Sequence, residues 1–368
     1  LNLCGHTELN ESAKDSIDQY GTSAASSRLV AGERYVHQEL ERSLADLYDV
    51  EDSIVFVSGH AANVSVVGHL FSTNDLIVYD SLIHDSIRQG ALLSGAKHIS
   101  FPHNDLEALD VLLSEKRCSY ERVIVIVEGL YSMDGDFPDL DRLVELKEKH
   151  KTFLMVDEAH SLGVLGKSGR GLREHFSLKN SSSVDLWMGT LSKTLSGCGG
   201  YICGSKKLVE YLRYFAPGFV YSVGLSPPLA AAALKAIELM NREPERVSSL
   251  QKNSQLMLSL AKEHGLDTGY AHGYAIVPII VKNSLLAMRL CNALLAEGVV
   301  AQSIVYPAVS ENDSRIRFII RDTVPDPRRP GRLVLQSLWT ANLIAVVPAI
   351  KRGAGDAQLI QRLFDWQV

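Results

Sequence analysis

The residues best suited to chemistry are a lysine and an aspartate that follow two predicted strands. Lys193 lies in Gly189-Thr-Leu-Ser-Lys-Thr-Leu-Ser-Gly-Cys-Gly-Gly200, a segment rich in small residues. Upstream, the apolar run from Phe153 to Val156 ends in Asp157-Glu-Ala-His160. Pyridoxal phosphate (PLP) requires a lysine amine for its aldehyde, a carboxylate for its pyridine nitrogen and hydrogen-bond donors for its phosphate. The residue types and their order therefore predict a PLP site.

Each of these residues has an ordinary explanation when it is taken alone. A single lysine is usually a solvated surface charge, and an aspartate after a strand often caps a helix. However, Lys193 stands between Leu191 and Leu195, and the glycines that follow allow the backbone to approach a ligand closely. A lysine amine in a partly dry site loses its proton more easily, so it can bond to an aldehyde.

A predicted strand that leads through a glycine into a helix offers a place for the phosphate. The stretch Val55-Phe-Val-Ser-Gly-His-Ala-Ala-Asn63 has this pattern, and the backbone N–H groups of Gly59 and His60 would face an anion. Thr190 adds a hydroxyl beside the lysine segment. Many such junctions are simple turns. His84, which follows another predicted strand, either stacks on the cofactor ring or is an ordinary loop histidine.

These residues need a scaffold of alternating strands and helices. Six runs, several of them apolar throughout, have the length and composition of buried strands: 53–57, 76–79, 123–127, 153–156, 185–188 and 200–203. Between them lie helical patterns, such as the one that begins with the capping residue Asn104 and the apolar stripe from Leu140 to Leu146. Strands that alternate with helices predict an α/β domain with a mostly parallel sheet.

A second, smaller domain is predicted after a long Ala-rich helix from Pro227 to Met240. The polar stretch Asn241-Arg-Glu-Pro-Glu-Arg246 follows it, and beyond lie a predicted strand at 276–281, a helix at 285–297 and a strand at 315–320. We therefore assign three parts to the chain: an N-terminal segment, 1–30, which we expect to be truncated, a large cofactor-binding domain, 31–241, and a small C-terminal α+β domain, 242–368.

Composition and charge exclude several classes of protein. The 368 residues, 46% hydrophobic and 22% charged, suffice for a large core and a second domain. The net charge of -6 predicts no nucleic-acid partner, and the apolar runs are too short to predict a membrane span. The five cysteines are scattered and odd in number, which favours a reducing, cytoplasmic setting. No Cys/His cluster has zinc spacing, so we predict no metal.

Seven motifs occur in order over roughly residues 1–320: Tyr20-Gly-Thr, Gly59-His, His84, Tyr131-Ser-Met-Asp-Gly135, Asp157-Glu-Ala-His160, Gly189-Thr-Leu-Ser-Lys193 and Arg315-Ile-Arg317. Together they resemble the α-oxoamine synthases, the family that includes 8-amino-7-oxononanoate synthase, 2-amino-3-ketobutyrate ligase, 5-aminolevulinate synthase and serine palmitoyltransferase. This resemblance implies a fold-type I PLP-dependent transferase, with a mostly parallel seven-stranded sheet in its large domain and a smaller C-terminal α+β domain.

The resemblance also implies a role for each matched residue. Lys193 would be the Schiff-base lysine and then the acid and base at the substrate Cα, Asp157 would pair with the pyridine nitrogen, and His84 would stack on the ring. His160 would contact the ring hydroxyl and help polarise the acyl carbonyl, and Arg317 would bind the amino acid carboxylate through a two-pronged contact. Further cofactor contacts are implied for Gly59, His60, Glu128, Ser132, Thr190 and, from the neighbouring subunit, Ser222.

The reaction implied by the resemblance is a decarboxylating condensation of an amino acid with an acyl thioester, which gives an α-amino ketone. The sequence of residues 219–228 is most similar to that of bacterial members associated with polyketide synthases. We therefore expect the acyl group to be carried by coenzyme A or by an acyl carrier protein. A homodimer with shared active sites is implied as well.

Two other interpretations remain open from the sequence. One is an aminotransferase or another fold-type I PLP enzyme, since one fold hosts many reactions. The other is a non-catalytic dimer partner of an active homologue. The motifs at Tyr131–Gly135 and Arg315–Arg317 favour the synthase, and the presence of Lys193, Asp157 and His160 argues against the non-catalytic partner.

Both ends of the chain depart from the family pattern. The chain opens at Leu1-Asn-Leu-Cys-Gly5, where Asn2 and Gly5 match a family run but Cys4 and His6 do not. From Arg321 to Val368 no family motif is found, and Pro325, Pro327 and Pro330 are followed by a largely apolar run. We expect this atypical tail to be a divergent end, a tag-like or frame-altered tail, or a partner-binding extension.

Overall fold

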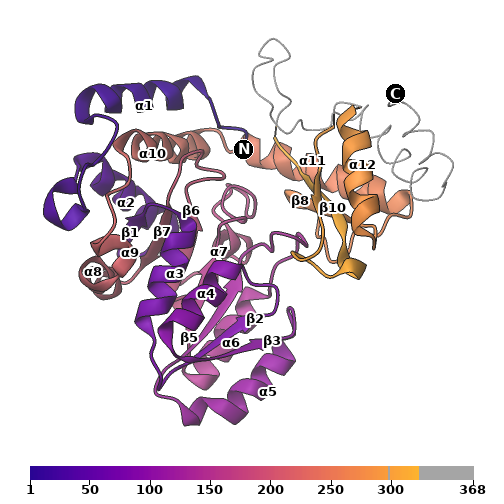
Figure 1. Ribbon diagram of the computed structural model, residues 1–368, viewed down its shortest axis with the longest axis horizontal. Helices are drawn as coiled ribbons and strands as arrows, with labels where there is room; N and C mark the ends of the chain where they lie inside the picture. The colour runs from indigo at the N-terminus through magenta and orange to yellow at the C-terminus, as the bar shows by residue number, and fades with distance from the viewer. Residues whose placement is uncertain (297–298, 323–368) are drawn as a thin grey trace. The chain divides into compact units, whose positions relative to one another are not determined.

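The computed structural model describes residues 1–296 and 299–322. The chain divides into two compact units (Figure 1). The large unit contains Asn2–Tyr131 and Phe137–Pro244, and the small unit contains Leu1, Ser132–Asp136 and the described residues that follow Pro244. The sequence predicted a single boundary after residue 241, and it did not predict that residues 132–136 belong to the small unit. Apart from Arg321 and Asp322, the atypical tail lies outside the described residues.

The large unit is built around a seven-stranded sheet with the strand order β1-β7-β6-β5-β4-β2-β3. The strands are β1 (Asp52–Phe56), β2 (Leu76–Asp80), β3 (Lys97–Phe101), β4 (Val123–Glu128), β5 (Phe153–Asp157), β6 (Leu186–Thr190) and β7 (Gly200–Gly204). β7 runs antiparallel to both of its neighbours, β1 and β6, and the other pairs are parallel. The prediction of a mostly parallel seven-stranded sheet is confirmed.

Continuous burial explains why the apolar runs form strands here. β2, β4, β6 and β7 are buried along their whole length, as expected for strands covered on both faces. β3 was not among the six predicted strands. It lies at the edge of the sheet, where Lys97, His98 and Ser100 are not fully buried and interrupt the apolar pattern.

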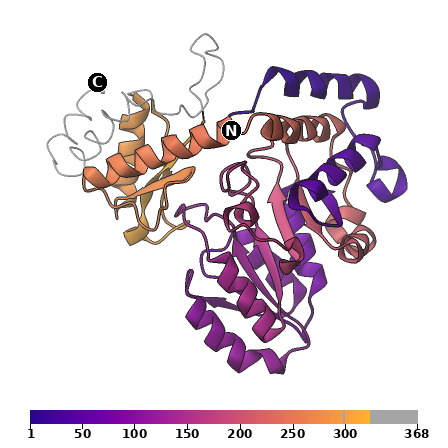
Figure 2. The ribbon, with the colours of Figure 1, turned by 180° about the vertical axis from the view of Figure 1, so that it is seen from behind.

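Ten α-helices accompany this sheet in the described residues of the large unit: α1 (Thr7–Tyr20), α2 (Tyr35–Tyr48), α3 (Gly59–Leu70), α4 (Asp85–Ser94), α5 (Leu106–Lys116), α6 (Leu140–His150), α7 (Leu172–His175), α8 (Lys206–Phe215), α9 (Pro217–Val220) and α10 (Pro227–Arg242). The indigo helix α1 lies along α10, as Figures 1 and 2 show. Among the helices of both units that the structure describes, none is long and apolar enough to cross a membrane.

One predicted helix start was wrong by one residue. α5 is capped by Asp105, whose side chain accepts a hydrogen bond from the backbone N–H of Ala108 at 2.8 Å. The predicted cap, Asn104, has a φ of 52° and donates its backbone N–H to Asp80 at 2.8 Å. The positive φ ends the preceding turn, so the capping geometry begins one residue later.

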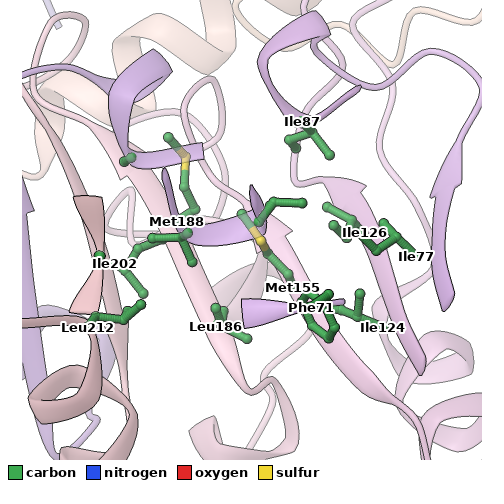
Figure 3. Close-up of a cluster of buried hydrophobic side chains, with 14 of the residues drawn as sticks. Phe71, Ile77, Ile87, Ile124, Ile126, Met155, Leu186, Met188, Ile202 and Leu212 are labelled. Carbon is green, nitrogen blue, oxygen red and sulfur yellow. The ribbon is translucent and has the colours of Figure 1, made fainter. Parts of the chain in front are cut away.

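One hydrophobic cluster of the large unit lies between one face of the sheet and α3, α4, α8 and α9, and Figure 3 shows part of it. The strands contribute every second residue to it, such as Ile124 and Ile126 of β4, because successive side chains of a strand point to opposite faces. Figure 3 shows Met155, Met188 and Ile202 of adjacent strands in the same cluster. This packing holds α3 and α4 beside the carboxyl ends of the parallel strands.

The small unit contains a three-stranded antiparallel sheet with the order β8-β10-β9, formed by β8 (Ile276–Ile280), β9 (Gln302–Ile304) and β10 (Arg315–Ile319). Its helices are α11 (Glu245–Glu263) and α12 (Ser284–Ala296). The predicted α+β character of the C-terminal part is therefore confirmed. The returning segment 132–136 is fastened to this sheet, since Asp134 forms a buried ion pair with Arg315 at 2.5 Å.

Candidate active site

Lys193 lies in an exposed position of the loop between β6 and β7. The base of this loop is closed by two backbone hydrogen bonds, from Leu191 N to Gly199 O at 2.9 Å and from Gly197 N to Leu191 O at 2.8 Å. Small residues are required here, because Gly199 has a φ of 147° and a Cβ on it would lie 2.7 Å from the Leu191 side chain. The loop is thus a defined scaffold that presents Lys193 to solvent.

The lysine loop contacts the turn that follows Asp157. Thr194 donates its hydroxyl to the carbonyl oxygen of Leu162 at 2.7 Å, two residues beyond His160. β5 and β6 are parallel neighbours, with Asp157 opposite Met188, so the two strands end at the same edge of the sheet. In open α/β sheets this edge is the usual place for a ligand. The structure therefore brings the segments of Asp157, His160 and Lys193 together.

Asp157 is a buried carboxylate with one hydrogen-bond donor on each oxygen. Only 4% of the residue is exposed. One oxygen accepts the backbone N–H of Ala159 and the other accepts the side-chain amide of Asn63, each at 3.0 Å. Glu128, at the end of β4, lies opposite Asp157 in the parallel register and is buried as well. Burying a carboxylate is costly unless it is hydrogen-bonded, and these donors meet that requirement.

The first turn of α3 forms a cradle against the ends of β6 and β7. A Cβ on Gly59 would lie 3.2 Å from the Thr190 hydroxyl oxygen, and one on Gly200 would lie 2.5 Å from the Gly59 Cα. Ser58 caps the helix by accepting from Ala61 N at 3.0 Å. The backbone N–H groups of Gly59 and His60 make no hydrogen bond within the described residues. A helix start with open N–H groups beside a hydroxyl can bind an anion.

These features fit PLP as the bound group. The cradle at Gly59 and Thr190 offers donors for a phosphate, Asp157 is a buried carboxylate for a ring nitrogen, and Lys193 supplies the amine, all at one edge of the sheet. The side chain of His60 lies at the surface, where its Nε2 is 3.2 Å from Gln89 Oε1. Only the backbone N–H of His60 is therefore a candidate for binding the phosphate.

The remaining predicted residues of the large unit lie in different surroundings. His84 is exposed and caps α4, with its Nδ1 2.7 Å from the Ser86 hydroxyl. His160 is half-buried in the turn after β5. Ser222 follows α9, and none of the described hydrogen bonds joins it to Asp157 or Thr190. Its predicted role toward a neighbouring subunit stays a prediction.

Arg317 and Ser132 belong to the small unit and contact each other there. Arg317 donates to the carbonyl oxygen of Ser132 at 2.8 Å and to the side-chain oxygen of Gln302 at 3.2 Å. It lines a cavity of about 510 Å³ together with Gln302 and Cys291. Burial lowers the pKa of the Arg317 guanidinium, which still carries its charge at neutral pH. A guanidinium beside a cavity can bind a carboxylate.

Sequence reasoning missed several residues that organise this site. Asn63 and Ser86 join Asp157 to His84 by hydrogen bonds, Ser192 places its hydroxyl 2.8 Å from that of Thr190, and Gln302 contacts Arg317. One signal was available for Asn63: it is a polar residue on the apolar helix α3, four positions after Gly59. Four positions place two residues on the same face of a helix.

One group of three metal-ligating side chains lies elsewhere in the described residues of the large unit, at His6, Glu8 and Glu243. Arg242 pairs with Glu8 at 2.6 Å and with Glu243 at 2.9 Å. The guanidinium therefore already supplies the positive charge that these two carboxylates require.

Glu158, directly after Asp157, is a fully buried carboxyl. It accepts the hydroxyl of Ser161 and the backbone N–H of Leu172, the latter at 2.9 Å. Burial raises its pKa to about 7, and the neighbouring Asp157 charge acts in the same direction. Gly171 has a φ of 80°, and a Cβ at this position would collide with the Glu158 carboxyl. Glu158 thus anchors the segment between β5 and α7, which carries His160.

The family model for aminotransferase class I and II matches residues 2–324 of this chain. Among curated proteins, the 8-amino-7-oxononanoate synthase of Symbiobacterium thermophilum is 39% identical over 320 residues, which cover 87% of this chain and 81% of that protein. The 4-hydroxy-2,2'-bipyrrole-5-methanol synthase of a Serratia species is 38% identical over 87% of this chain, and this chain spans only 48% of it.

Solved structures lead to the same group of proteins. Serine palmitoyltransferase from S. paucimobilis with bound PLP has a TM-score of 0.86 and 25% identity, and covers 98% of this chain and 86% of its own. The 8-amino-7-oxononanoate synthase of Francisella tularensis has a TM-score of 0.78 and 27% identity, and covers 95% of this chain and 94% of its own. The predicted fold-type I architecture is confirmed by these matches.

Glu158→Gln should change how stability depends on pH. The folded protein holds the Glu158 proton up to about pH 7, whereas the unfolded chain loses it near pH 4.5. Because the folded state binds more protons in this window, its stability falls as pH rises through it. The free energy of unfolding of the native protein, measured by urea titration, should therefore fall relative to Glu158→Gln by ~3 kcal/mol between about pH 4.5 and 7.

Glu107→Gln, on the exposed surface of α5, is the control for the loss of one carboxylate charge. If the native protein and Glu158→Gln keep the same difference in unfolding free energy across this pH range, then Glu158 does not titrate as its burial requires.

Proposed function

Because this chain belongs to the aminotransferase class I and II family, we propose that it acts as an α-oxoamine synthase: a PLP-dependent acyltransferase that condenses an amino acid with an acyl thioester and releases carbon dioxide to give an α-amino ketone. The observation that carries this proposal is the gathering of the Lys193 loop, the buried Asp157 and the open helix start at Gly59 along one edge of the sheet. The named relatives, two kinds of synthase and a palmitoyltransferase, favour this reaction over transamination.

PLP, when bound, supplies an aldehyde that bonds to amines and a ring that delocalises the electron pair left at Cα after a proton is removed. In our proposal Lys193 holds the cofactor and then moves the proton at the substrate Cα. The Asp157 carboxylate keeps the proton on the ring nitrogen. The backbone N–H groups of Gly59 and His60 and the hydroxyl of Thr190 bind the phosphate.

The other predicted residues complete this assignment. In this proposal His84 would stack on the ring, and His160 would contact the ring hydroxyl and polarise the acyl carbonyl. Glu128 and Ser132 would border the ring. Arg317 would bind the amino acid carboxylate, a role supported by its half-buried guanidinium and by the cavity that it lines. A fixed guanidinium binds a carboxylate through two parallel hydrogen bonds, so the substrate is oriented as well as held.

We propose that the protein is a homodimer with shared sites, in which Ser222 reaches the phosphate of the neighbouring subunit. Two adjoining surface segments support this. Gly224 N donates to Ser26 O at 2.9 Å and joins the segment after α9 to the one that precedes the helical turn Arg28–Gly32. Val30 is 81% exposed and Tyr221 is 87% exposed. Large apolar side chains on adjoining exposed segments mark an interaction surface.

The proposed location is the cytoplasm, which the scattered, odd-numbered cysteines favour. The acyl donor is proposed to be acyl-coenzyme A or an acyl carrier protein, and the amino acid is the open part of the proposal. Glycine, alanine, serine and arginine form the first panel to test.

Lys193→Ala should abolish both the visible absorbance of the lysine-bound cofactor and product formation, because no other amine of the loop can replace it. Lys207→Ala, at an exposed position of α8, is the matched control and should leave both unchanged. The assay measures carbon dioxide release and product mass for each amino acid with acyl-coenzyme A and with acyl carrier protein.

The synthase requires carbon dioxide release only when amino acid and thioester are both present. An aminotransferase would instead release none and convert the amino acid to a keto acid. Normal turnover by Lys193→Ala would refute the assignment of the lysine, and the absence of carbon dioxide in every combination would refute the synthase.

Arg317→Lys should raise the KM for the amino acid on the order of tenfold or more, because the two-pronged hydrogen bond to a carboxylate is lost. Cofactor absorbance should be unchanged, since Arg317 is not assigned to PLP. Lys282→Ala, an exposed cation of the same unit, is the control. An unchanged KM would remove Arg317 from the substrate site.

Val30→Glu should convert the dimer to a monomer and reduce activity, because a charge would have to be buried in the proposed interface. Sedimentation velocity reports the oligomeric state directly. Val111→Glu, at a position 60% exposed on α5, is the matched control and should remain dimeric. A native protein that sediments as an active monomer would contradict the shared site.

A further inference from the structure

A continuous chain of hydrogen bonds connects the two predicted ring-facing residues, Asp157 and His84. Asp157 Oδ2 accepts from Asn63 Nδ2 at 3.0 Å. Asn63 Nδ2 also donates to Ser86 Oγ at 3.0 Å, and Ser86 Oγ lies 2.7 Å from His84 Nδ1. α3 and α4, which carry Asn63 and Ser86, lie side by side (Figure 1). Neither Asn63 nor Ser86 is a cofactor or substrate contact in the proposed function.

The donors and acceptors of this chain have one consistent direction. An ionised carboxylate only accepts, so Asn63 must turn its amide nitrogen toward Asp157. The two hydrogens of that nitrogen serve Asp157 and Ser86. The Asn63 oxygen is buried without a hydrogen-bond partner among the described residues. The opposite amide orientation would place this oxygen against the Asp157 carboxylate, which explains why the amide keeps its nitrogen there.

The same direction continues to the histidine. Ser86 Oγ accepts from Asn63, so its single hydrogen is free to point at His84 Nδ1. The backbone N–H of Ser86 also points at Nδ1, at 3.3 Å. With two donors aimed at it, Nδ1 is an acceptor. The proton of the neutral imidazole is therefore on Nε2, the nitrogen at the other side of the ring.

Burial makes this arrangement hard to replace. Asn63 is 2% exposed and Ser86 is 0% exposed. Water is excluded from both, so neither side chain can exchange its partner for solvent. A buried donor that loses its acceptor has a high cost, and each link therefore stabilises the next.

We propose that Asn63 and Ser86 are positioning residues, which fix His84 in its Nε2–H tautomer and orientation according to the charge of Asp157. This rests on the proposed function, in which both Asp157 and His84 face the cofactor ring. The charge of Asp157 then determines, through Asn63 and Ser86, which nitrogen of His84 carries the proton. No proton moves along the chain; the hydrogen bonds only orient the groups.

The test is nuclear magnetic resonance of the full chain with 15N-labelled histidine, first without and then with PLP. The His84 signal is assigned by its loss in His84→Asn. In the native protein we expect an acceptor Nδ1 and a protonated Nε2. In Asn63→Ala and in Ser86→Ala, His84 should show a mixture of both tautomers. Ser65→Ala is the matched control, because this buried hydroxyl of α3 bonds to Gly218 N at 2.8 Å and is not part of the chain.

A second measurement is the dissociation constant of PLP, from absorbance titration of the cofactor-free protein. Asn63→Ala and Ser86→Ala should each raise it about fivefold, the effect of one hydrogen bond. The double variant should resemble the single ones, because both substitutions break the same chain. Two unconnected structural effects would multiply instead.

The proposal is overturned if His84 keeps the native tautomer in both variants, or if their effects on the dissociation constant multiply in the double variant. Should Asn63→Ala fail to fold, Ser86→Ala decides alone, since it removes one oxygen atom. A native protein that binds no PLP would refute the proposed function, whereas the tautomer of His84 in the cofactor-free protein would still decide the role of Asn63 and Ser86.

Discussion

The buried carboxylate of Asp157 is the constraint on which the site depends. A charge in a dry environment requires donors close by, and the large unit supplies them from two directions: the backbone of Ala159 in its own turn, and the amide of Asn63 from α3. The second donor requires α3 to lie against the carboxyl end of the sheet. The core between the strands and α3 holds the helix there, so the hydrophobic packing and the hydrogen bonding of Asp157 depend on each other.

The close position of α3 in turn requires small residues at its contacts. Gly200 stands where any side chain would meet Gly59, and Gly59 stands against Thr190. The same closeness places the first N–H groups of α3, which make no hydrogen bond within the described residues, beside the hydroxyl of Thr190, which is the geometry of an anion site. The close packing of α3 against the sheet therefore supports both ends of a ligand. It supplies a donor to the carboxylate that would bind a ring nitrogen, and it positions the helix start that would bind a phosphate.

The buried strands could be predicted from their apolar runs, because a strand covered on both faces has little choice of residue. Lys193, Asp157 and the motifs around them could be recognised because their residue types are unusual for their surroundings. β3 could not, since an edge strand half in solvent has no such pattern. Asn63 and Ser86 could not be assigned either, since each is ordinary in its own segment and gains a role only from a contact with a residue distant in the chain. The same is true of Gln302 beside Arg317 and of 132–136, which joins the small unit.

The sequence by itself determined the fold class, the family resemblance and the identification of Lys193 and Asp157, because each of these depends on local patterns of residue type and spacing. The tertiary structure decided which side chains orient them. Asn63 is 94 positions from Asp157 along the chain, and Ser86 is 23 positions from Asn63. No local pattern encodes such contacts. These contacts exist because the parallel strands end at one edge of the sheet, and because core packing holds α3 and α4 against the sheet near that edge. Asn63 of α3 is then close enough to donate a hydrogen bond to the buried Asp157 carboxylate.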